Sequence, residues 1–402
     1  MELPIVKLGD ICDFQNGFAF KSKLFTDSGV PILRISNIQS GSIDLKRVAY
    51  IDPNSYKENL DRYRVVDGDL LIAMSGATTG KVGLNNTGIV FLLNQRVGKF
   101  VPSNKLDKQY LFYYLSTQVE NHLEISAGSA QPNLSTEQIK GMSIPLPNIL
   151  AQKRIVAILD QAFADLEQVR AKTEQNLKNA RELFDSYLQQ VFNQRGDGWK
   201  ELNLESIVSE DCSLSYGIVQ PGDDFNGGLP VVRPTDLKVE LITSDDLKLI
   251  DPAKSEGYKR TVLQGGELLV CVRGSTGITS IACKSLAGAN VTRGIVPVRF
   301  NPEFITSRFG YYQFISPLVQ SQIKDATYGA ALMQINIRDF RKIRVSTPSI
   351  EIQESIVNKL DSLRPDLTRT EEIYKQKLLA LDELKKSILQ KAFSGELTAK
   401  AE

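Results

Sequence analysis

Apolar residues recur every three or four positions along two long stretches of the chain, 151–193 and 352–392. This spacing places them on one face of a helix. The opposite face of the first stretch carries charged residues such as Arg170, Glu174 and Lys178, so the apolar stripe is narrow. A narrow stripe between charged flanks is typical of a coiled-coil seam. We therefore predict two long helices, each about 60 Å in length. Pro365 predicts a kink in the second helix, or a short helix followed by a longer one.

The two stretches repeat each other at a constant distance. LPNILAQKRIVAILD (146–160) and TPSIEIQESIVNKLD (347–361) align without a gap, so Pro147 and Gln152 recur as Pro348 and Gln353, 201 positions later. The same distance separates LFDSYLQQVF (183–192) from LKKSILQKAF (384–393). A constant distance means that neither helix has an insertion. Since solenoid repeats are usually 20–50 residues long, we infer duplication of a larger unit made of a domain and a helix.

The segments before each helix consist of short β-branched runs bounded by Gly, Asp, Asn and Pro, which predicts β-rich domains. They also match each other, more loosely: PILRISNI (31–38) with PVVRPTDL (230–237), GDLLIAMSGATTG (68–80) with GELLVCVRGSTG (266–277), and GSAQPNLS (128–135) with YGAALMQIN (328–336). Short helices are predicted at 107–123 and 305–323.

The predicted fold class is therefore α+β, with two β-rich mixed domains at 1–150 and 196–350. Two long antiparallel helices, at 151–195 and 351–402, separate them and hold them at opposite ends of a rod. The alternative is that each helix packs onto its own domain.

Composition limits the chemistry of the chain. Hydrophobic residues make up 42% and charged residues 24%, no apolar run approaches the length of a membrane span, and the N-terminus lacks the layout of a signal peptide. The four cysteines form no close pair, which favours a cytoplasmic location, and His122 is the single histidine. Zinc sites and a Ser-His-Asp set in each half are therefore excluded. Because the net charge is +1, DNA binding would need local basic groups or a partner.

The loops that resemble catalytic motifs fail on spacing. SGATTGKVG (75–83) has three residues between its glycines and a valine after its lysine, whereas a phosphate-binding loop needs four residues and Ser or Thr. We interpret it as a turn between strands, and RGSTG (273–277) likewise. Neither half contains a GxGxxG loop or the Pro-Pro-aromatic tetrapeptide of amino-methyltransferases. The paired carboxylates, such as Asp67 with Asp69, lie in turn-like settings. We assign no catalytic residue and no metal ligand.

Basic and amide residues recur at matched places in the two halves. Arg34 pairs with Arg233 after an extended run, and Arg96 pairs with Arg293. Arginine reads guanine through two hydrogen bonds, Asn or Gln reads adenine, and Lys mostly holds phosphate. The alternative is that the paired arginines form salt bridges inside each domain. The candidate DNA-binding residues are Lys21, Lys23, Arg34, Asn94, Gln95, Arg96, Arg233, Arg273, Arg293, Arg338 and Arg341.

Taken together, NGFAFKSKLF, ILRISNI, GDLLIAMSGATTGKVG, GSAQPNLS, LPNILAQKRIVAILD and SILQKAFSGELT make nearly the whole chain resemble the specificity (S) subunits of type I restriction-modification systems. The chain departs from the family's usual Pro-Pro-Leu-x-Glu-Gln helix start, because Ala151 and Ile352 stand where an acidic residue is expected. The second domain matches the usual family sequence less well than the first.

The resemblance implies a non-catalytic subunit whose two domains each read one half of a split DNA site. It implies that the helices set the distance between half-sites and dock two methyltransferase (M) subunits, joined by restriction (R) subunits for cleavage. S-adenosylmethionine, ATP and magnesium would be bound by those partners, and no membrane is expected. The residues expected to pair the helices or dock partners are Gln152, Ile155, Leu159, Leu166, Phe184, Gln353, Ile356, Leu360, Leu384 and Phe393.

Two other hypotheses come from different classes. One is a coiled-coil scaffold with two protein-binding domains, which salt-dependent DNA affinity would distinguish from a DNA-reading subunit. The other is a free-standing nuclease or methyltransferase, which the missing cofactor loop and catalytic set disfavour.

Overall fold

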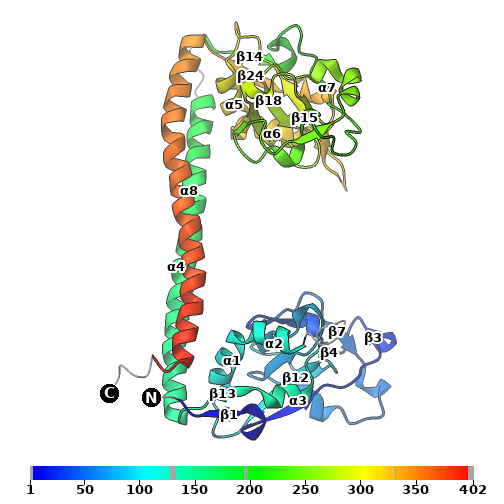
Figure 1. Cartoon of the computed structure of the whole chain (residues 1–402), viewed down its shortest axis with the longest axis vertical. Coiled ribbons are helices and arrows are strands. Elements are labelled where there is room, and N and C mark those ends of the chain that lie inside the picture. Colours follow the sequence, from blue (N-terminus) through cyan, green and yellow to red (C-terminus); the bar gives the residue numbers. More distant parts are fainter. Residues whose placement is uncertain (1–2, 127–132, 194–195, 197, 331, 397–402) are drawn as a thin grey trace. The chain divides into compact units, whose positions relative to one another are not determined.

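The computed structural model describes residues 3–126, 133–193, 196, 198–330 and 332–396. The chain divides into two compact units, the first comprising Met1–Thr173 and Gln376–Glu402 and the second Glu174–Lys375. Each unit contains one β-rich domain and a part of each long helix (Figure 1). Each predicted helical segment, 151–195 and 351–402, is therefore divided between the two units. The predicted boundaries of these segments stay predictions.

The first unit combines short strands with three short helices and part of the long helix α4. Its helices are α1 Lys108–Thr117, α2 Val119–Ser126, α3 Thr136–Gly141 and α4 Ile149–Asn193. Its strands are β1 Ile5–Lys7, β2 Cys12–Asn16, β3 Phe25–Thr26, β4 Val30–Leu33, β5 Ile38–Gln39, β6 Ser42–Ile43, β7 Ala49–Ile51, β8 Arg64–Val65, β9 Leu70–Ala73, β10 Val82–Leu84, β11 Phe91–Leu93, β12 Val97–Pro102 and β13 Ser143–Pro145. The larger sheets have the orders β10-β9-β12-β2 and β3-β7-β4-β11-β8.

The second unit has the same plan. Its helices are α5 Ser307–Ile315, α6 Pro317–Asp325, α7 Ile337–Phe340 and part of α8 Ile350–Phe393. Its strands are β14 Lys200–Asn203, β15 Leu229–Val232, β16 Leu241–Ile242, β17 Lys248–Ile250, β18 Leu268–Cys271, β19 Thr279–Ala282, β20 Asn290–Val291, β21 Ile295–Val298, β22 Thr327–Tyr328, β23 Gln334–Ile335 and β24 Arg344–Thr347. The larger sheets have the orders β16-β19-β18-β21 and β17-β15-β20.

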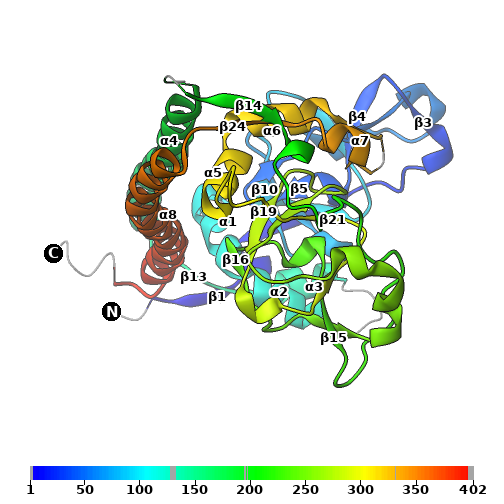
Figure 2. The same cartoon turned by 90° about the horizontal axis from the view of Figure 1, so that it is seen from above.

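Strand pairing confirms that the two domains are copies of one fold. β4 runs parallel to β11 and antiparallel to β7, and β15 runs parallel to β20 and antiparallel to β17. The β9–β12 ladder matches the β18–β21 ladder, since Leu70 faces Phe100 and Leu268 faces Val298. The following short helix packs beside the same sheet in each domain, α1 beside β10 and α5 beside β19 (Figure 2).

The local sequence interpretations are confirmed. Both predicted helical segments form, as α1 and α2 in the first domain and as α5 and α6 in the second. SGATTGKVG is the turn between β9 and β10, and RGSTG is the turn between β18 and β19. Leu134 donates its N–H to the Met74 carbonyl, and Ile335 donates to the Val272 carbonyl, so GSAQPNLS and YGAALMQIN end in equivalent places. Residues 128–132 and Ala331 of these segments lie outside the described residues.

Of the two alternatives predicted at Pro365, the division into two helices is wrong, because α8 is one helix with Pro365 inside it, and the kink stays a prediction. Proline removes one backbone hydrogen bond of the helix. The residues beside it attach α8 to the second domain: the Arg364 guanidinium pairs with Glu240 at 2.7 Å and donates to the Tyr311 hydroxyl at 2.8 Å. Arg308 pairs with Asp361 at 2.6 Å and also with Glu240. Burial lowers the pKa of Arg308, but hydrogen bonds to Asp361 and Glu240 outweigh it, so the net pKa is raised.

The helices pair antiparallel within each unit, as predicted. In the first unit Arg170 of α4 pairs with Asp382 of α8, and Lys385 lies over the Phe163 ring at 5.0 Å. In the second unit Arg181 of α4 pairs with Glu371 of α8 at 2.7 Å, and Arg364 lies over the Phe184 ring at 5.6 Å. The rod between the domains stays a prediction.

The contacts of the two units are made by matching positions of the repeat, but matching positions carry opposite partners of each contact. At the distance of 201 positions, Arg170 matches Glu371 and Asp382 matches Arg181. In the same way Phe163 matches Arg364 and Phe184 matches Lys385, so cation and ring change places. In both units α4 supplies the arginine of the ion pair and α8 the acid. An α4–α4 pair would bring Arg170 against Arg181, so the charges favour pairing of α4 with α8.

A buried glutamine joins each long helix to its own domain. The Gln152 carbonyl oxygen accepts the Asp107 N–H at 2.8 Å, and its amide donates to the carbonyls of Lys105 at 2.9 Å and Pro147 at 2.8 Å. Gln353 repeats all three contacts, accepting from Thr306 at 2.9 Å and donating to Phe304 at 2.8 Å and Pro348 at 2.9 Å. Asp107 and Thr306 are the N-caps of α1 and α5, so each glutamine connects two helix starts. We call this arrangement the glutamine lock.

We predict that Gln353→Leu lowers the free energy of unfolding of the second unit by about 2–4 kcal/mol, because one buried and two partly buried backbone groups lose their partner. Trp199, the single tryptophan, lies in this unit beside Phe309, so its fluorescence during urea unfolding measures the change. Gln189→Leu is the control, because Gln189 is exposed on α4 in the same unit. Equal stability of the two variants would contradict the lock.

Candidate nucleic-acid interface

Arg34 and Arg233 occupy equivalent positions, directly after β4 and β15, where each begins a short 3-10 turn. The Arg34 N–H donates to the side-chain oxygen of Asn37 at 3.0 Å, and the Arg233 N–H donates to Asp236 at 2.7 Å. Their guanidinium groups differ in their contacts. Arg34 donates to the Arg47 carbonyl at 2.8 Å, whereas Arg233 forms hydrogen bonds of 3.1 and 2.9 Å with the Asp236 carboxylate. The Asp236 hydrogen bond raises the pKa of Arg233. Both arginines therefore have roles within their own domains.

The predicted pairing of Arg96 with Arg293 is wrong by one residue. In the turn after β11, Asn94 N–H donates to Leu33 and Gln95 N–H donates to Phe18. In the turn after β20, the corresponding donors are Thr292, to Val232, and Arg293, to Ile218. The next carbonyls, of Arg96 and Gly294, accept from Met74 and Val272. Gln95 is thus the equivalent of Arg293, and Arg96 is the equivalent of Gly294. The error arose because arginine was matched with arginine, which placed the two copies one position too close together; the backbone hydrogen bonds match Gln95 with Arg293 instead.

Arg273 and Arg293 lie together in the second domain. They line an open concavity of about 330 Å³, together with Ile218, Val219, Pro234, Thr292, Gly294 and Leu332. Burial raises the pKa of Tyr216, and the nearby guanidinium groups of Arg293 and Arg273 act to lower it. Within the described part of the chain, neither guanidinium has a hydrogen bond or an ion pair. Two guanidinium groups without partners beside an apolar wall are suited to a flat ligand that presents hydrogen-bond acceptors along its edge.

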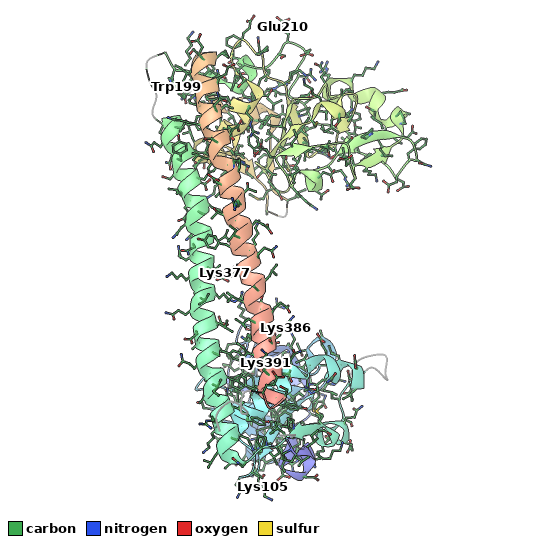
Figure 3. All side chains as sticks on the ribbon, turned by 60° about the vertical axis from the view of Figure 1, so that its left-hand side comes forward. Lys105, Trp199, Glu210, Lys377, Lys386 and Lys391 are labelled. Atoms are coloured by element: carbon green, nitrogen blue, oxygen red, sulfur yellow. The ribbon has the colours of Figure 1, made fainter. Side chains whose placement is uncertain are left out.

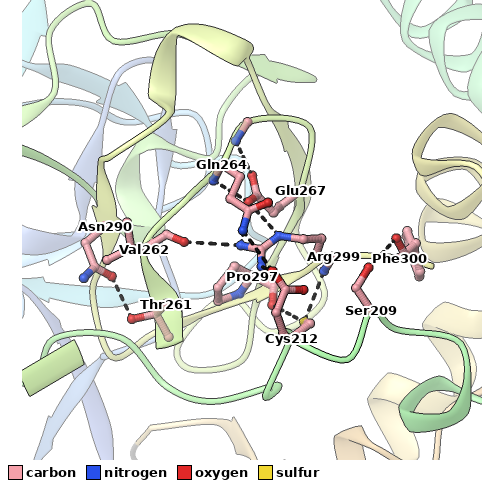
Figure 4. Close-up of polar contacts among 12 residues, drawn as sticks. Ser209, Cys212, Thr261, Val262, Gln264, Glu267, Asn290, Pro297, Arg299 and Phe300 are labelled. Atoms are coloured by element: carbon pink, nitrogen blue, oxygen red, sulfur yellow. Dashed lines mark hydrogen bonds and ion pairs between the residues drawn. The ribbon is translucent and has the colours of Figure 1, made fainter. Parts of the chain in front are cut away.

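Most other arginines of the second unit are held by acidic groups or carbonyls. Arg299, which is not among the residues predicted from the sequence, has several such partners at once (Figure 4). It pairs with Asp211 at 2.7 Å and with the buried Glu267 at 3.0 Å. Glu267 in turn accepts the N–H groups of Gln264 at 2.6 Å and Gly265 at 2.8 Å. Similar intramolecular partners hold Arg233, Arg308, Arg341, Arg344 and Arg364.

The remaining DNA-binding candidates differ in how freely their side chains project. Lys21 and Lys23 are exposed around the 3-10 turn that precedes β3, and Arg96 is exposed after β11. Asn94 is half-buried and accepts the Gln95 N–H through its side chain at 2.7 Å. Arg338 is exposed on α7, but Arg341 donates to the Ser213 carbonyl at 2.9 Å. Their contacts with bases or phosphates stay predictions.

Several residues predicted to pair the helices or to dock partners are packed into their own unit. The side chains of Gln152, Ile155, Leu159, Gln353 and Leu360 are fully buried. Ile356 and Phe184 pack into the core of the second domain, and Phe393 makes edge-to-face contacts with Tyr110 and Tyr114, with 5.2 Å between ring centroids in each pair. Burial excludes a direct contact between these fully buried groups and a partner. Leu166 is half-buried and Leu384 is 47% exposed, so a docking role for them stays a prediction.

Exposed lysines and leucines lie along α8 in the first unit. Lys377, Lys386 and Lys391 lie along this segment with exposed side chains (Figure 3). The exposed Leu384 lies midway between Lys377 and Lys391, and the seven-residue spacing places these three on one face, whereas Leu379 and Lys386 lie on another. A helix face with this composition suits contact with another protein.

Comparison with known proteins identifies the family. The type I restriction modification DNA specificity domain matches residues 2–178 and 220–379, once in each half. The chain belongs to this family. It is 26% identical over 421 residues to the EcoBI specificity subunit of Escherichia coli, covering 98% of this chain and 86% of that protein. It is 23% identical over 395 residues to the EcoKI specificity subunit of Escherichia coli strain K12, covering 93% and 83%.

Solved structures share the fold of this specificity-family chain. A chain from a structure described as the basis of complex assembly and conformational transition of the type I R-M system superimposes with a TM-score of 0.73, at 19% identity, covering 98% of this chain and 97% of that one. The HsdS subunit of Thermoanaerobacter tengcongensis superimposes with a TM-score of 0.54, at 19% identity, covering 98% and 97%. The predicted fold class is confirmed.

Other site classes gain no support from the described residues. Among them, no cluster of three or more His, Cys, Asp or Glu side chains could hold a metal ion, and none of the described helices is long and apolar enough to cross a membrane. His122 is a core residue: burial lowers its pKa, and its Nδ1 lies 3.2 Å from the Gly80 carbonyl oxygen.

We predict that Arg233→Ala lowers the free energy of unfolding of the second unit by about 1 kcal/mol, since a half-exposed ion pair contributes little more. Arg273→Ala should leave it unchanged, because that guanidinium has no partner among the described residues. Urea unfolding followed by Trp199 fluorescence measures both. A larger loss for Arg273→Ala than for Arg233→Ala would show that Arg273 is structural.

Proposed function

We propose that this chain is the non-catalytic DNA-recognition subunit of a type I restriction-modification complex and that it reads a bipartite target site. The observation that carries the proposal is the match of the specificity domain to both halves of the chain. The two domains share one fold but present different exposed side chains at the equivalent turns, Gln95 in one and Arg293 in the other. Two copies of one scaffold with different side chains would read two different half-sites.

The long helices would position partners rather than read DNA. We propose that the chain docks two methyltransferase subunits, with restriction subunits joining for cleavage, and that the complex methylates adenine. The exposed residues of α8 that share one face, such as Lys377, Leu384 and Lys391, offer a surface for docking. S-adenosylmethionine, ATP and magnesium would be bound by the partner subunits, and the complex would act in the cytoplasm.

Electrostatics supports a complex rather than DNA binding by this chain alone. The net charge is +1, so the chain has no global basic field to hold a phosphate backbone. Local groups such as Lys21, Lys23 and Arg338 would contact phosphates, and partners would supply the rest. The scaffold alternative is disfavoured by the family match.

We predict that replacing residues 1–150 by the corresponding domain of another specificity subunit changes one half of the methylated sequence and leaves the other half unchanged. The junction lies before Gln152, whose lock contacts are all made to backbone groups, so a foreign domain of the same fold can satisfy them. Base-resolved detection of N6-methyladenine in cells that contain the methyltransferase subunit reports both halves.

Replacement of 196–350 is the matched control and should change only the other half. A change of both half-sites after either replacement would contradict the proposal that each domain reads separately.

A further inference from the structure

Gln95 and Arg293 occupy one backbone position that both domains hold rigidly. The Gln95 N–H donates to the Phe18 carbonyl at 2.9 Å, and the Arg293 N–H donates to the Ile218 carbonyl at 2.9 Å. The preceding residue closes a turn in each case, because Val97 N–H donates to Asn94 at 2.8 Å and Ile295 N–H donates to Thr292 at 2.9 Å. Backbone hydrogen bonds on both sides therefore fix where each side chain leaves the surface.

A neighbouring glycine shows how tightly this turn is packed against the chain in both domains. A Cβ added to Gly17 would lie 2.1 Å from the Asn94 carbonyl oxygen, and one added to Gly217 would lie 1.9 Å from the Val291 carbonyl oxygen. Only glycine permits this approach at either place. The same close packing of the turn is thus built twice, although the exposed residues on it differ.

The side chains at this position have no structural task among the described residues. Gln95 and Arg293 are exposed, and neither side chain has a hydrogen bond or ion pair within the described chain. This separates Arg293 from Arg233, Arg299 and Arg308, whose guanidinium groups are held by carboxylates. A rigid backbone that carries a free polar side chain is the arrangement expected of a recognition residue.

Arg293 lies with a second arginine and several apolar residues around one concavity. Arg273 lines the same concavity of about 330 Å³, with Ile218, Pro234 and Leu332 forming apolar walls. A side chain at Gly294 would crowd this concavity, because a Cβ there would lie 2.5 Å from the Pro234 ring. Two guanidinium groups beside an apolar wall match the edge of a base better than an isolated phosphate, which a fully solvated lysine can hold.

We propose that the residue at this turn reads a base in each half-site, with Arg293 selecting guanine in the second half-site and Gln95 selecting adenine in the first. The guanidinium of Arg293 presents two parallel donors, which match the O6 and N7 acceptors of guanine. The amide of Gln95 presents one donor and one acceptor, which match N7 and the N6 amino group of adenine. Arg273, which lines the same concavity, assists Arg293. This assignment rests on the proposed DNA-recognition function.

The test uses the full chain together with its methyltransferase subunit and base-resolved mapping of N6-methyladenine. In Arg293→Gln, one guanine of a single half-site should lose its discrimination by about 5- to 150-fold or be replaced by adenine. In Gln95→Arg, one adenine of the opposite half-site should be relaxed or replaced by guanine. Arg260→Gln is the matched control, because Arg260 is an exposed arginine of the same domain that does not line the concavity.

Each other outcome has a definite meaning. An unchanged motif in Arg293→Gln, or an equal fall in methylation at all sites as expected for a phosphate contact, would overturn the assignment. So would a lowered melting temperature of Arg293→Gln relative to Arg260→Gln, since it would show a structural role. If the unaltered chain directs no split methylation motif, the proposed function itself fails, and that result is distinct from the other three.

Discussion

The glutamine lock is the contact on which the two halves of this protein depend. Gln152 and Gln353 are fully buried, and each makes hydrogen bonds to three backbone groups, of which one is buried and two are partly buried. Because each glutamine lies one turn into a long helix and reaches the N-cap of a short one, it fixes the direction in which the helix leaves its domain. All of its contacts are to backbone, so they are insensitive to the domain's side chains. The domains can therefore diverge in what they recognise while the junction with the helix stays constant.

The helix pair adds a second constraint, which concerns the choice of partner helix. The same positions of the repeat make these contacts in both units. A position that carries the ring or the arginine in α4 carries the cation or the acid in α8. Exposed ion pairs of this kind add little stability. Their effect is to disfavour the pairing of two identical helices, because two α8 helices would bring Glu371 against Asp382 and Arg364 against Lys385. The charges thus favour the pairing of one α4 with one α8 over pairing of identical helices.

The sequence predicted the features that depend on local spacing, and it missed those that depend on contacts between residues far apart in the chain. The helix repeat has no insertions, so its alignment correctly matched Gln152 with Gln353, and periodicity identified the helices. It assigned the glutamines to helix pairing and partner docking, because a polar residue at a helix start gives no sign that it is buried. Arg96 was matched with Arg293 because both follow similar strands, and only hydrogen bonds to Phe18 and Ile218, remote in sequence, reveal the shift. The structural roles of Arg233 and Arg299 likewise depend on acids whose proximity no local pattern shows.

If this chain supplies the sequence specificity of a methyltransferase, methylation should depend on its presence. The most direct measurement is base-resolved detection of N6-methyladenine in DNA from cells that express the methyltransferase subunit with or without this chain. We expect a single split motif that is present only when the chain is present. Absence of any new methylation, while the two proteins are shown to be associated, would contradict it.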